Sequence, residues 1–303
     1  MNELELIELT RKYFGRDRTA LREALKTFDV SNQKIKKFKK IIRSCTSQPF
    51  FITEGLNDCV RENIINKNFN EIEMNDLGDL SWNIEILLND NIHTGYDWDK
   101  NLSIKCGGKA KILQILINSI IPAYTINKYY ISYSKPENYY EFGKIVSLED
   151  NESKIINKIK QEFKKLNIFY VSKQLANKKF EDLISDCNSE GNASIFDCLF
   201  SDIYNYNNNI HRFNDKQIIN HAGASVSWHE YYNLSEKLIY KEEWISYKSK
   251  DTLCIITDKN GQIKKLNLWR DFEDEKHSKI SYNINKAYKL KRKKYVSNPI
   301  TSL

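Results

Sequence analysis

The segment that most constrains the fold is the most apolar run of the chain, Ile112–Ile121, which lies between Gly107-Gly108 and Pro122. It has ten residues, Gln114 and Asn118 among them, whereas a helix that crosses a lipid bilayer needs about 20 apolar residues. The run is therefore too short to span a membrane and must be buried in a protein core. We predict a buried helix that begins after Gly108 and ends at Pro122.

The residues around this run alternate between strand-like and helix-like patterns. Leu102–Lys105 is typical of a strand, and the β-rich runs Thr125–Tyr133 and Tyr139–Val146 flank a turn signal, which together predict a hairpin. Asp150–Leu166 has the periodicity of an amphipathic helix, and Ile168–Val171 has the pattern of a further strand. Over residues 96–175 the expected order is βαββαβ, which resembles the ferredoxin-like split βαβ unit. That order implies no activity, because the fold carries many.

The flanking regions complete a predicted α+β fold class. Residues 1–95 are expected to be mainly helical, although Ser81–Leu88 fits either a strand or a helix. Residues 176–303 are expected to be mixed, with a helix at Leu234–Trp244, a β-hairpin over 252–269 and a basic tail. The hairpin is indicated by Asn260-Gly261, because this pair readily adopts the positive φ values of a tight turn.

The positive charge of the chain is concentrated in two short segments. The sequence has 47 Lys+Arg and 40 Asp+Glu, a formal net charge of +7. Each segment contains six basic residues and no acid: Lys34, Lys36, Lys37, Lys39, Lys40 and Arg43 in the first, and Lys286, Lys289, Lys291, Arg292, Lys293 and Lys294 in the second. Removing these twelve charges from +7 leaves −5 for the rest. This pattern favours local contacts with phosphates or acidic surfaces over a chain that is basic throughout.

Other features of the sequence favour a cytoplasmic protein. The first eight residues are acidic and lack the long apolar segment of a signal peptide. The six cysteines are scattered, without a C-x-x-C pair, which is typical of reduced thiols rather than of a disulfide framework. The abundance of Asn, Lys, Ile and Tyr suggests an AT-rich genome, such as that of a low-GC bacterium or a phage.

Three carboxylates form the most specific catalytic pattern. Glu54 follows a short apolar run, and Asp97 and Asp99 form an Asp-x-Asp pair 43 residues later. This pattern resembles the metal-binding carboxylates of Toprim domains, which occur in primases, topoisomerases and some nucleases. The resemblance implies that Glu54, Asp97 and Asp99 hold Mg²⁺, since hard carboxylate ligands suit that ion. The alternative interpretation is that they are surface carboxylates.

Two further motifs are compatible with chemistry but are better explained by structure. His211, His221 and His229 are close in sequence, yet their spacing matches no metal motif, so we expect structural or hydrogen-bonding histidines. Cys106–Lys109 contains two glycines between the expected strand and helix, where backbone N–H groups could bind phosphate. A phosphate-binding P-loop signature is absent, so a tight turn is the preferred interpretation.

Aromatic residues are concentrated in the expected hairpin. Tyr130, Tyr139 and Tyr140 are the candidates for contact with a partner, by stacking on bases or by anchoring a protein interface. Because side chains alternate between the two faces of a strand, about half of the aromatic residues in this region should face the core instead.

Together these features favour a non-enzymatic interaction protein that docks on an acidic surface of a protein complex or a nucleic acid, in the setting of conflict between bacteria and phages. The expected contacts are the two basic clusters and the three tyrosines, with no cofactor and no membrane. One alternative is a Toprim-like nuclease that uses Mg²⁺ at Glu54, Asp97 and Asp99. A second alternative is a nucleic-acid binder without catalytic activity.

Overall fold

The computed structural model describes residues 1–27, 33–56, 58–67, 78–89, 100–134, 139–145, 147–185, 191–200, 210–214, 225–233, 235–246, 252–270 and 278–281. Within these residues the protein is a mixed α and β structure with eight helices and a large, mainly antiparallel sheet of 12 strands. The strand order is β1-β2-β3-β4-β5-β9-β10-β11-β12-β13-β14, with β6 beside β4. The chain divides into two units, residues 1–98, 110–129 and 145–205 in the first and residues 99–109, 130–144 and 206–303 in the second.

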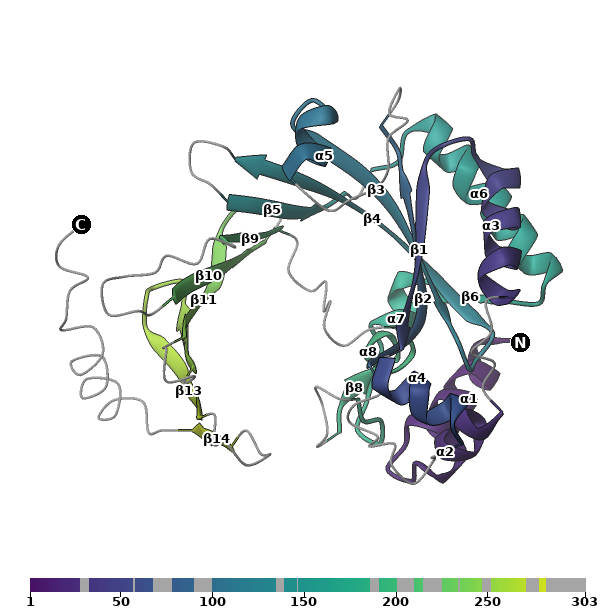
Figure 1. Ribbon diagram of the computed structural model, residues 1–303, viewed down its shortest axis with the longest axis horizontal. Helices are drawn as coiled ribbons and strands as arrows, with labels where there is room; N and C mark the ends of the chain where they lie inside the picture. Colours follow the sequence, from purple (N-terminus) through teal and green to yellow (C-terminus); the bar gives the residue numbers. More distant parts are fainter. Residues whose placement is uncertain are drawn as a thin grey trace. The chain divides into compact units, whose positions relative to one another are not determined.

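The first unit contains a sheet with two long helices on one face. Its strands are β1 (Phe50–Leu56), β2 (Gly78–Leu87), most of β3 (Lys109–Asn118), the first part of β4 (Ala123–Ser134) and β6 (Phe169–Tyr170). The helices are α3 (Gln33–Cys45) and α6 (Asp150–Lys165), which contact each other and lie side by side in Figure 1.

The core of this unit lies between the sheet and the two helices. Alternate residues of β2 and β3 face the helices because side chains alternate along a strand. The core contains Trp82, Ile84, Ile86, Leu113, Ile115 and Ile117 from the sheet, and Phe38, Ile42, Ile156, Ile159 and Phe163 from the helices. The Phe38 ring meets the rings of Trp82 and Phe163 edge-on, with centroids 6.2 and 6.3 Å away. Burial of this apolar stripe directs the remaining residues of α3 toward solvent.

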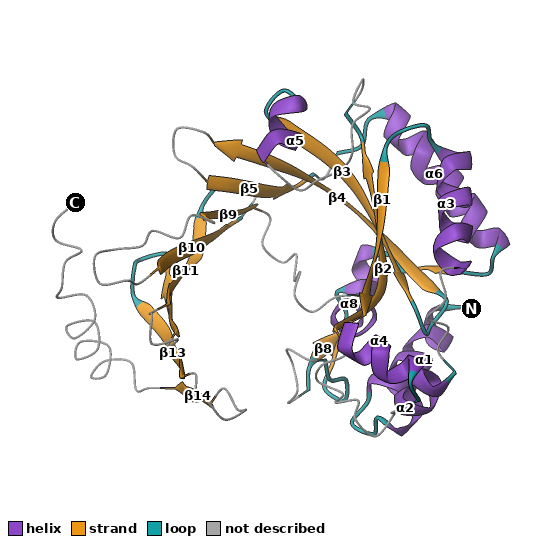
Figure 2. Ribbon diagram, in the orientation of Figure 1, coloured by secondary structure: helices purple, strands orange, loops and turns teal. Residues whose placement is uncertain are grey.

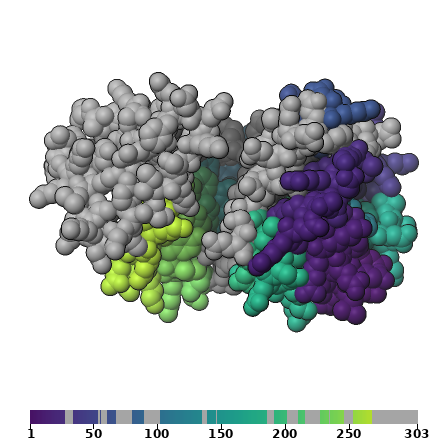
Figure 3. All heavy atoms as spheres, turned by 90° about the horizontal axis from the view of Figure 1, so that it is seen from below, coloured from purple at the N-terminus to yellow at the C-terminus, as the bar shows by residue number. Residues whose placement is uncertain are grey.

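Short helices and a small second sheet complete the first unit. They are α1 (Glu3–Phe14), α2 (Thr19–Lys26), α4 (Asp58–Ile65), α7 (Lys173–Ala176) and α8 (Ile195–Leu199), with β7 (Lys179–Phe180) paired to β8 (Ala193–Ser194). Helix α1 begins with a capping box between Asn2 and Glu5, which satisfies backbone groups at its first turn. An ion pair of 2.8 Å joins Arg11 of α1 to Asp182, which follows β7. In Figure 3 the purple N-terminal helices adjoin the teal atoms of the later part of this unit.

The second unit consists mostly of antiparallel strands, which Figure 2 shows in orange. They are the end of β4, β5 (Tyr139–Lys144), β9 (Ile210–Asn214), β10 (Ser225–Tyr232), β11 (Leu238–Ser246), β12 (Thr252–Asp258), β13 (Ile263–Arg270) and β14 (Ser278–Ser281). The short helix α5 (Lys100–Lys105) also belongs to it. Ile245, Leu253, Ile255 and Leu266 are buried.

The structure confirms several predicted elements. Residues 150–165 form a helix, 123–134 and 139–144 form strands, and the hairpin at 252–270 turns through Gly261 with a φ of 74°. The ambiguous segment 81–88 belongs mainly to strand β2. The helices expected near the N-terminus are α1, α2 and α3.

Two assignments in the central region are wrong, so the βαββαβ order is not confirmed. Residues 102–105, expected to form a strand, belong to helix α5, and the apolar run expected to form a helix belongs to strand β3. Gly107 and Gly108 have φ values of 71° and 98°, and they end α5 rather than begin a helix. The run is apolar without alternation because nearly every residue of β3 is buried, on both faces of the sheet.

A third correction concerns Leu234–Trp244, which was expected to be helical. Strand β11 occupies most of this segment, after a turn in which Asn233 Oδ1 accepts hydrogen bonds from the backbone of Ser235 and Lys237. Such a side-chain bond favours a turn over a helix start. Among the helices that the structure describes, none is long and apolar enough to cross a membrane.

Candidate functional site

The solvent-facing side of α3 carries a row of cations. Lys36, Lys37, Lys39, Lys40 and Arg43 are all exposed, and the structure records no ion pair between them and any described carboxylate. Pairing within the helix is impossible, because α3 contains no acidic residue. Lys34 differs from the others, since its Nζ donates to the carbonyl oxygen of Ser119 at 3.4 Å and the side chain is half-buried.

Helix α6 adds further cations beside this row. Lys154, Lys158 and Lys164 are exposed, whereas Lys165 pairs with Glu162 at 2.5 Å and Lys160 lies over the ring of Tyr170. Helices α3 and α6 contact each other on the same face of the sheet, as Figure 1 shows. Because both helices expose cations, we infer that these cations form one surface. We call it the α3–α6 cationic face, formed by Lys36, Lys37, Lys39, Lys40, Arg43, Lys154, Lys158 and Lys164.

This face lacks exposed apolar anchors. The large hydrophobic side chains that are exposed in the described part of the chain lie on other segments: Met1, Leu4, Phe51, Ile65, Ile104, Leu148 and Ile239. The core of a typical protein–protein interface contains buried aromatic or aliphatic side chains, surrounded by a polar rim. The cationic face therefore offers electrostatic contacts without an apolar centre.

A cavity of about 440 Å³ lies where the end of α3 approaches the start of α6. Arg43 and Lys158 of the cationic face both line it. The other lining residues are Ser44, Cys45, Thr46, Ser47, Gln48, Leu88, Glu149, Asn151, Glu152 and Ile155. Burial raises the pKa of the Cys45 thiol, which disfavours the thiolate form at neutral pH.

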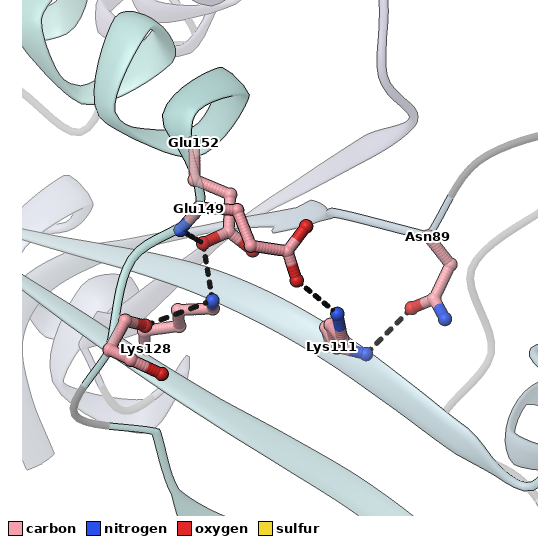
Figure 4. A network of polar contacts seen from close by, with 6 residues as sticks. Asn89, Lys111, Lys128, Glu149 and Glu152 are labelled. Carbon is pink, nitrogen blue, oxygen red and sulfur yellow. Dashed lines mark hydrogen bonds and ion pairs between the residues drawn. The ribbon is translucent and has the colours of Figure 1, made fainter.

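Both carboxylates of the cavity are paired with lysines of the sheet, as Figure 4 shows. Glu149 accepts from Lys111 Nζ at 2.5 Å, and this hydrogen bond and charge lower the pKa of Glu149. Glu152 forms a buried ion pair with Lys128, whose Nζ also donates to the Ser147 carbonyl at 3.3 Å. The negative charges of the lining are thus compensated.

The other face of this sheet buries a small polar cluster. Glu85 is only 2% exposed, and its Oε1 accepts hydrogen bonds from the Tyr129 hydroxyl at 2.7 Å and from Asn83 Nδ2 at 3.1 Å. On the neighbouring strands, Asn127 Nδ2 donates to Gln114 Oε1 at 3.4 Å. These bonds satisfy polar groups that would otherwise be costly to bury.

In the second unit, one face of the sheet carries a ladder of stacked rings. Tyr140 stacks on Phe213 with centroids 5.4 Å apart, and His211 lies parallel to Tyr231 at 4.5 Å. Tyr231 in turn stacks on Tyr240 at 4.2 Å. Because most ring faces in the ladder are covered by neighbouring rings, few remain for stacking on bases. The expectation that Tyr140 stacks on a partner therefore gains no support from this geometry.

Two of the three clustered histidines meet in this ladder. His211 Nε2 and His229 Nδ1 are 3.0 Å apart and form a hydrogen bond, and their rings are nearly parallel. Burial, and to a lesser extent the charge of His229, lower the pKa of His211 to about 4. No group of three or more His, Cys, Asp or Glu side chains suited to a metal ion occurs among the described residues.

On the opposite face, Arg212 is the centre of a paired cluster that includes two of the predicted tyrosines. Its Nε donates to Glu141 Oε2 at 2.6 Å, while Tyr130 donates its hydroxyl hydrogen to Glu141 Oε1 at 2.7 Å. The guanidinium lies over the rings of Tyr139 and Tyr232, at 5.8 and 4.6 Å. Burial acts to lower the pKa of Arg212, but the bond with Glu141 raises it overall. Tyr130 and Tyr139 thus have partners within the sheet.

Several predicted site residues lie outside the part of the chain that the structure describes. Glu54 lies on β1 opposite Trp82, whereas Asp97 and Asp99 lie outside the described residues, so the proposed Mg²⁺ site stays a prediction. The second basic cluster also lies outside the described residues; it includes Lys289, Lys291, Arg292, Lys293 and Lys294. The same holds for His221. The Cys106–Lys109 turn follows a helix and precedes a strand, so its glycines do not lie at a helix N-terminus.

The sequence did not indicate the contribution of α6 or the cavity. Lysines of α6 are interspersed with acids along the chain, and only the fold shows that Glu152 is turned inward to Lys128. The pairing of Lys111 with Glu149 spans 38 residues and leaves no local pattern. No family model, curated protein or solved structure matches this chain.

Proposed function

We propose that the protein binds nucleic acid through the α3–α6 cationic face, without catalysing a reaction there. The single observation that supports this most strongly is the set of exposed cations on α3 that have no acidic partner in the described structure. Lysine and arginine side chains that neutralise phosphates release condensed counterions, which drives sequence-independent binding. Such contacts position a protein on the phosphate backbone without reading bases.

The composition of the face favours a phosphate backbone over an acidic protein. A stable protein interface draws most of its energy from a few buried aromatic, arginine or aliphatic anchors. The exposed residues of α3 between Lys36 and Ser44 are four lysines, one arginine and one serine, with no apolar anchor among them. A regular polyanion needs only matched charge, so it is the better partner for this surface.

Charge reversal tests the proposal directly. The variant Lys36→Glu/Lys37→Glu/Lys40→Glu should abolish binding of a labelled DNA or RNA duplex of about 20 base pairs, measured by fluorescence anisotropy between about 50 and 200 mM KCl. In wild type, the logarithm of the binding constant should fall linearly with the logarithm of salt concentration. Neutralising the same three lysines to Gln should reduce that slope by about 3 if each one contacts a phosphate.

A matched control separates the face from net charge. Lys173→Glu/Lys179→Glu/Lys265→Glu changes the net charge equally at three exposed lysines outside the face and should retain most of the binding. Equal loss in both variants, or binding that survives reversal of α3, would refute the assignment. If no nucleic acid binds while a native pull-down recovers an acidic protein, the nucleic-acid proposal is wrong and the partner is a protein with an acidic surface.

The same duplex, incubated with Mg²⁺, tests the nuclease alternative. Cleavage that Glu54→Gln abolishes would replace the binding proposal with the Toprim-like one. Cleavage that Glu54→Gln leaves unchanged would exclude Glu54 as a catalytic ligand.

A further inference from the structure

The cavity beside Arg43 and Lys158 has a charge balance that selects its ligand. Its two carboxylates are each compensated by a lysine from the sheet, through the Lys111–Glu149 and Lys128–Glu152 pairs. The structure records no ion pair between Arg43 or Lys158 and a described carboxylate, and both side chains are exposed. The cavity therefore presents two uncompensated positive charges, which favour an anionic ligand.

We propose that this cavity binds the phosphomonoester group of a nucleotide, with Arg43 and Lys158 contacting the phosphate. The proposal extends the nucleic-acid binding proposed above, because Arg43 and Lys158 also belong to the cationic face. A guanidinium forms paired, charge-assisted hydrogen bonds with phosphate oxygens, and an ammonium adds a point charge with three donors.

The rest of the lining suits the sugar and base of a nucleotide. Five neutral side chains provide hydrogen-bond donors and acceptors: Ser44, Thr46, Ser47, Gln48 and Asn151. Leu88 and Ile155 provide apolar contact for a ring. The volume of about 440 Å³ lies within the range of small-molecule sites, roughly 300–1,000 Å³.

Two kinds of ligand present a phosphomonoester group: the phosphorylated end of a nucleic-acid strand and a free mononucleotide. Both present a doubly ionised phosphate that an internal phosphodiester lacks. An end bound in the cavity would continue along the α3–α6 cationic face, which shares Arg43 and Lys158 with the lining.

Isothermal titration calorimetry with thymidine 5′-monophosphate, thymidine and inorganic phosphate tests the cavity without a duplex. Wild type should bind the monophosphate more tightly than either of the other two compounds. Arg43→Gln and Lys158→Gln should each weaken binding of the monophosphate by about tenfold, which is typical of one lost charge-assisted hydrogen bond. Lys173→Gln removes one positive charge at an exposed lysine outside both the cavity lining and the α3–α6 cationic face, and should retain the affinity.

The two kinds of ligand are then separated with duplexes that carry a 5′-phosphate or a 5′-hydroxyl. Tighter binding of the phosphorylated duplex, lost in Arg43→Gln, identifies a strand end, and equal binding of both duplexes together with monophosphate binding identifies the free nucleotide. Equal affinities for thymidine monophosphate and inorganic phosphate would overturn the nucleotide assignment. If neither compound binds, the proposal of a phosphate site in this cavity is wrong. In wild type, duplex binding without monophosphate binding would overturn the cavity proposal alone, and monophosphate binding without duplex binding would overturn the nucleic-acid proposal alone.

Discussion

The His211–His229 pair makes the stability of the second unit depend on pH in a direction that can be worked out. Burial and the neighbouring imidazole lower the pKa of His211 from 6.5 to about 4. The unfolded chain therefore binds this proton more readily than the folded protein between those values. Linkage requires that the folded state loses stability as pH falls through this interval, and that the contribution is fully present above about pH 6.5.

The size of the effect follows from the same two values. A pKa lowered from 6.5 to about 4 corresponds to about 3 kcal/mol, with a slope of at most about 1.4 kcal/mol per pH unit. Groups facing the pair are Tyr231, Phe213 and Glu242, which lies opposite His229 in the strand register. Burial raises the pKa of Tyr231, so this residue stays neutral over the interval and binds no further proton.

The variant His211→Phe isolates this contribution. Phenylalanine retains an aromatic ring between Phe213 and Tyr231 but has no proton to bind. Urea unfolding followed by tryptophan fluorescence should show the stability difference between about pH 7 and pH 4 reduced by about 3 kcal/mol relative to wild type. Tyr231→Phe is the control, since it changes the ladder without changing proton uptake, and it should keep the wild-type pH dependence. A full wild-type pH dependence in His211→Phe would refute the reasoning.

Two further predictions concern stability at constant pH. Glu152→Gln leaves Lys128 buried without its counter-charge and should lower the free energy of unfolding by about 3–5 kcal/mol in urea titrations. Glu162→Gln removes the carboxylate of a partly exposed ion pair and should change the free energy of unfolding by less than about 1 kcal/mol. Gly143→Ala would place a Cβ 2.1 Å from the Tyr130 ring and should cost about 1–3 kcal/mol. A double-mutant cycle checks the cause, because the cost should shrink in a Tyr130→Leu background; an unchanged cost would show that the ring is not responsible.

Elements with a clear local signal could be predicted from the sequence. Helix α6 has apolar residues at helical spacing, with Ile156, Ile159 and Phe163 buried, and the Asn260-Gly261 turn sets the geometry of its hairpin. Strand β3 could not be assigned, because a segment buried on both sides shows no period of two. Its isoleucines favour a strand, but the two glycines before it also fit a helix start. Only the pairing of this segment with β2 shows that it is a strand and not a helix.

The candidate site was predictable to the extent that it is local. The basic side of α3 follows from one helix whose polar positions contain no acid. The compensation of Glu149 by Lys111 depends on β3 and α6 meeting in the fold, and so does the cavity that these elements help to form. The tyrosines were correctly expected on strands, but their partners come from distant segments such as Arg212 and Phe213.

The contrast between paired and uncompensated cations indicates which surface serves an external partner. Inside the sheets, Lys128 and Arg212 are each held by a carboxylate, because a buried cation without a partner carries a large desolvation cost. Exposed cations carry no such cost, but five of them within eight residues repel one another without contributing to the core. That arrangement is unfavourable for the isolated helix and becomes favourable when a polyanion lies across it. Reversal of Lys36, Lys37 and Lys40 should therefore leave the free energy of unfolding nearly unchanged or slightly higher while abolishing binding. A structural role for these lysines would produce the opposite pattern.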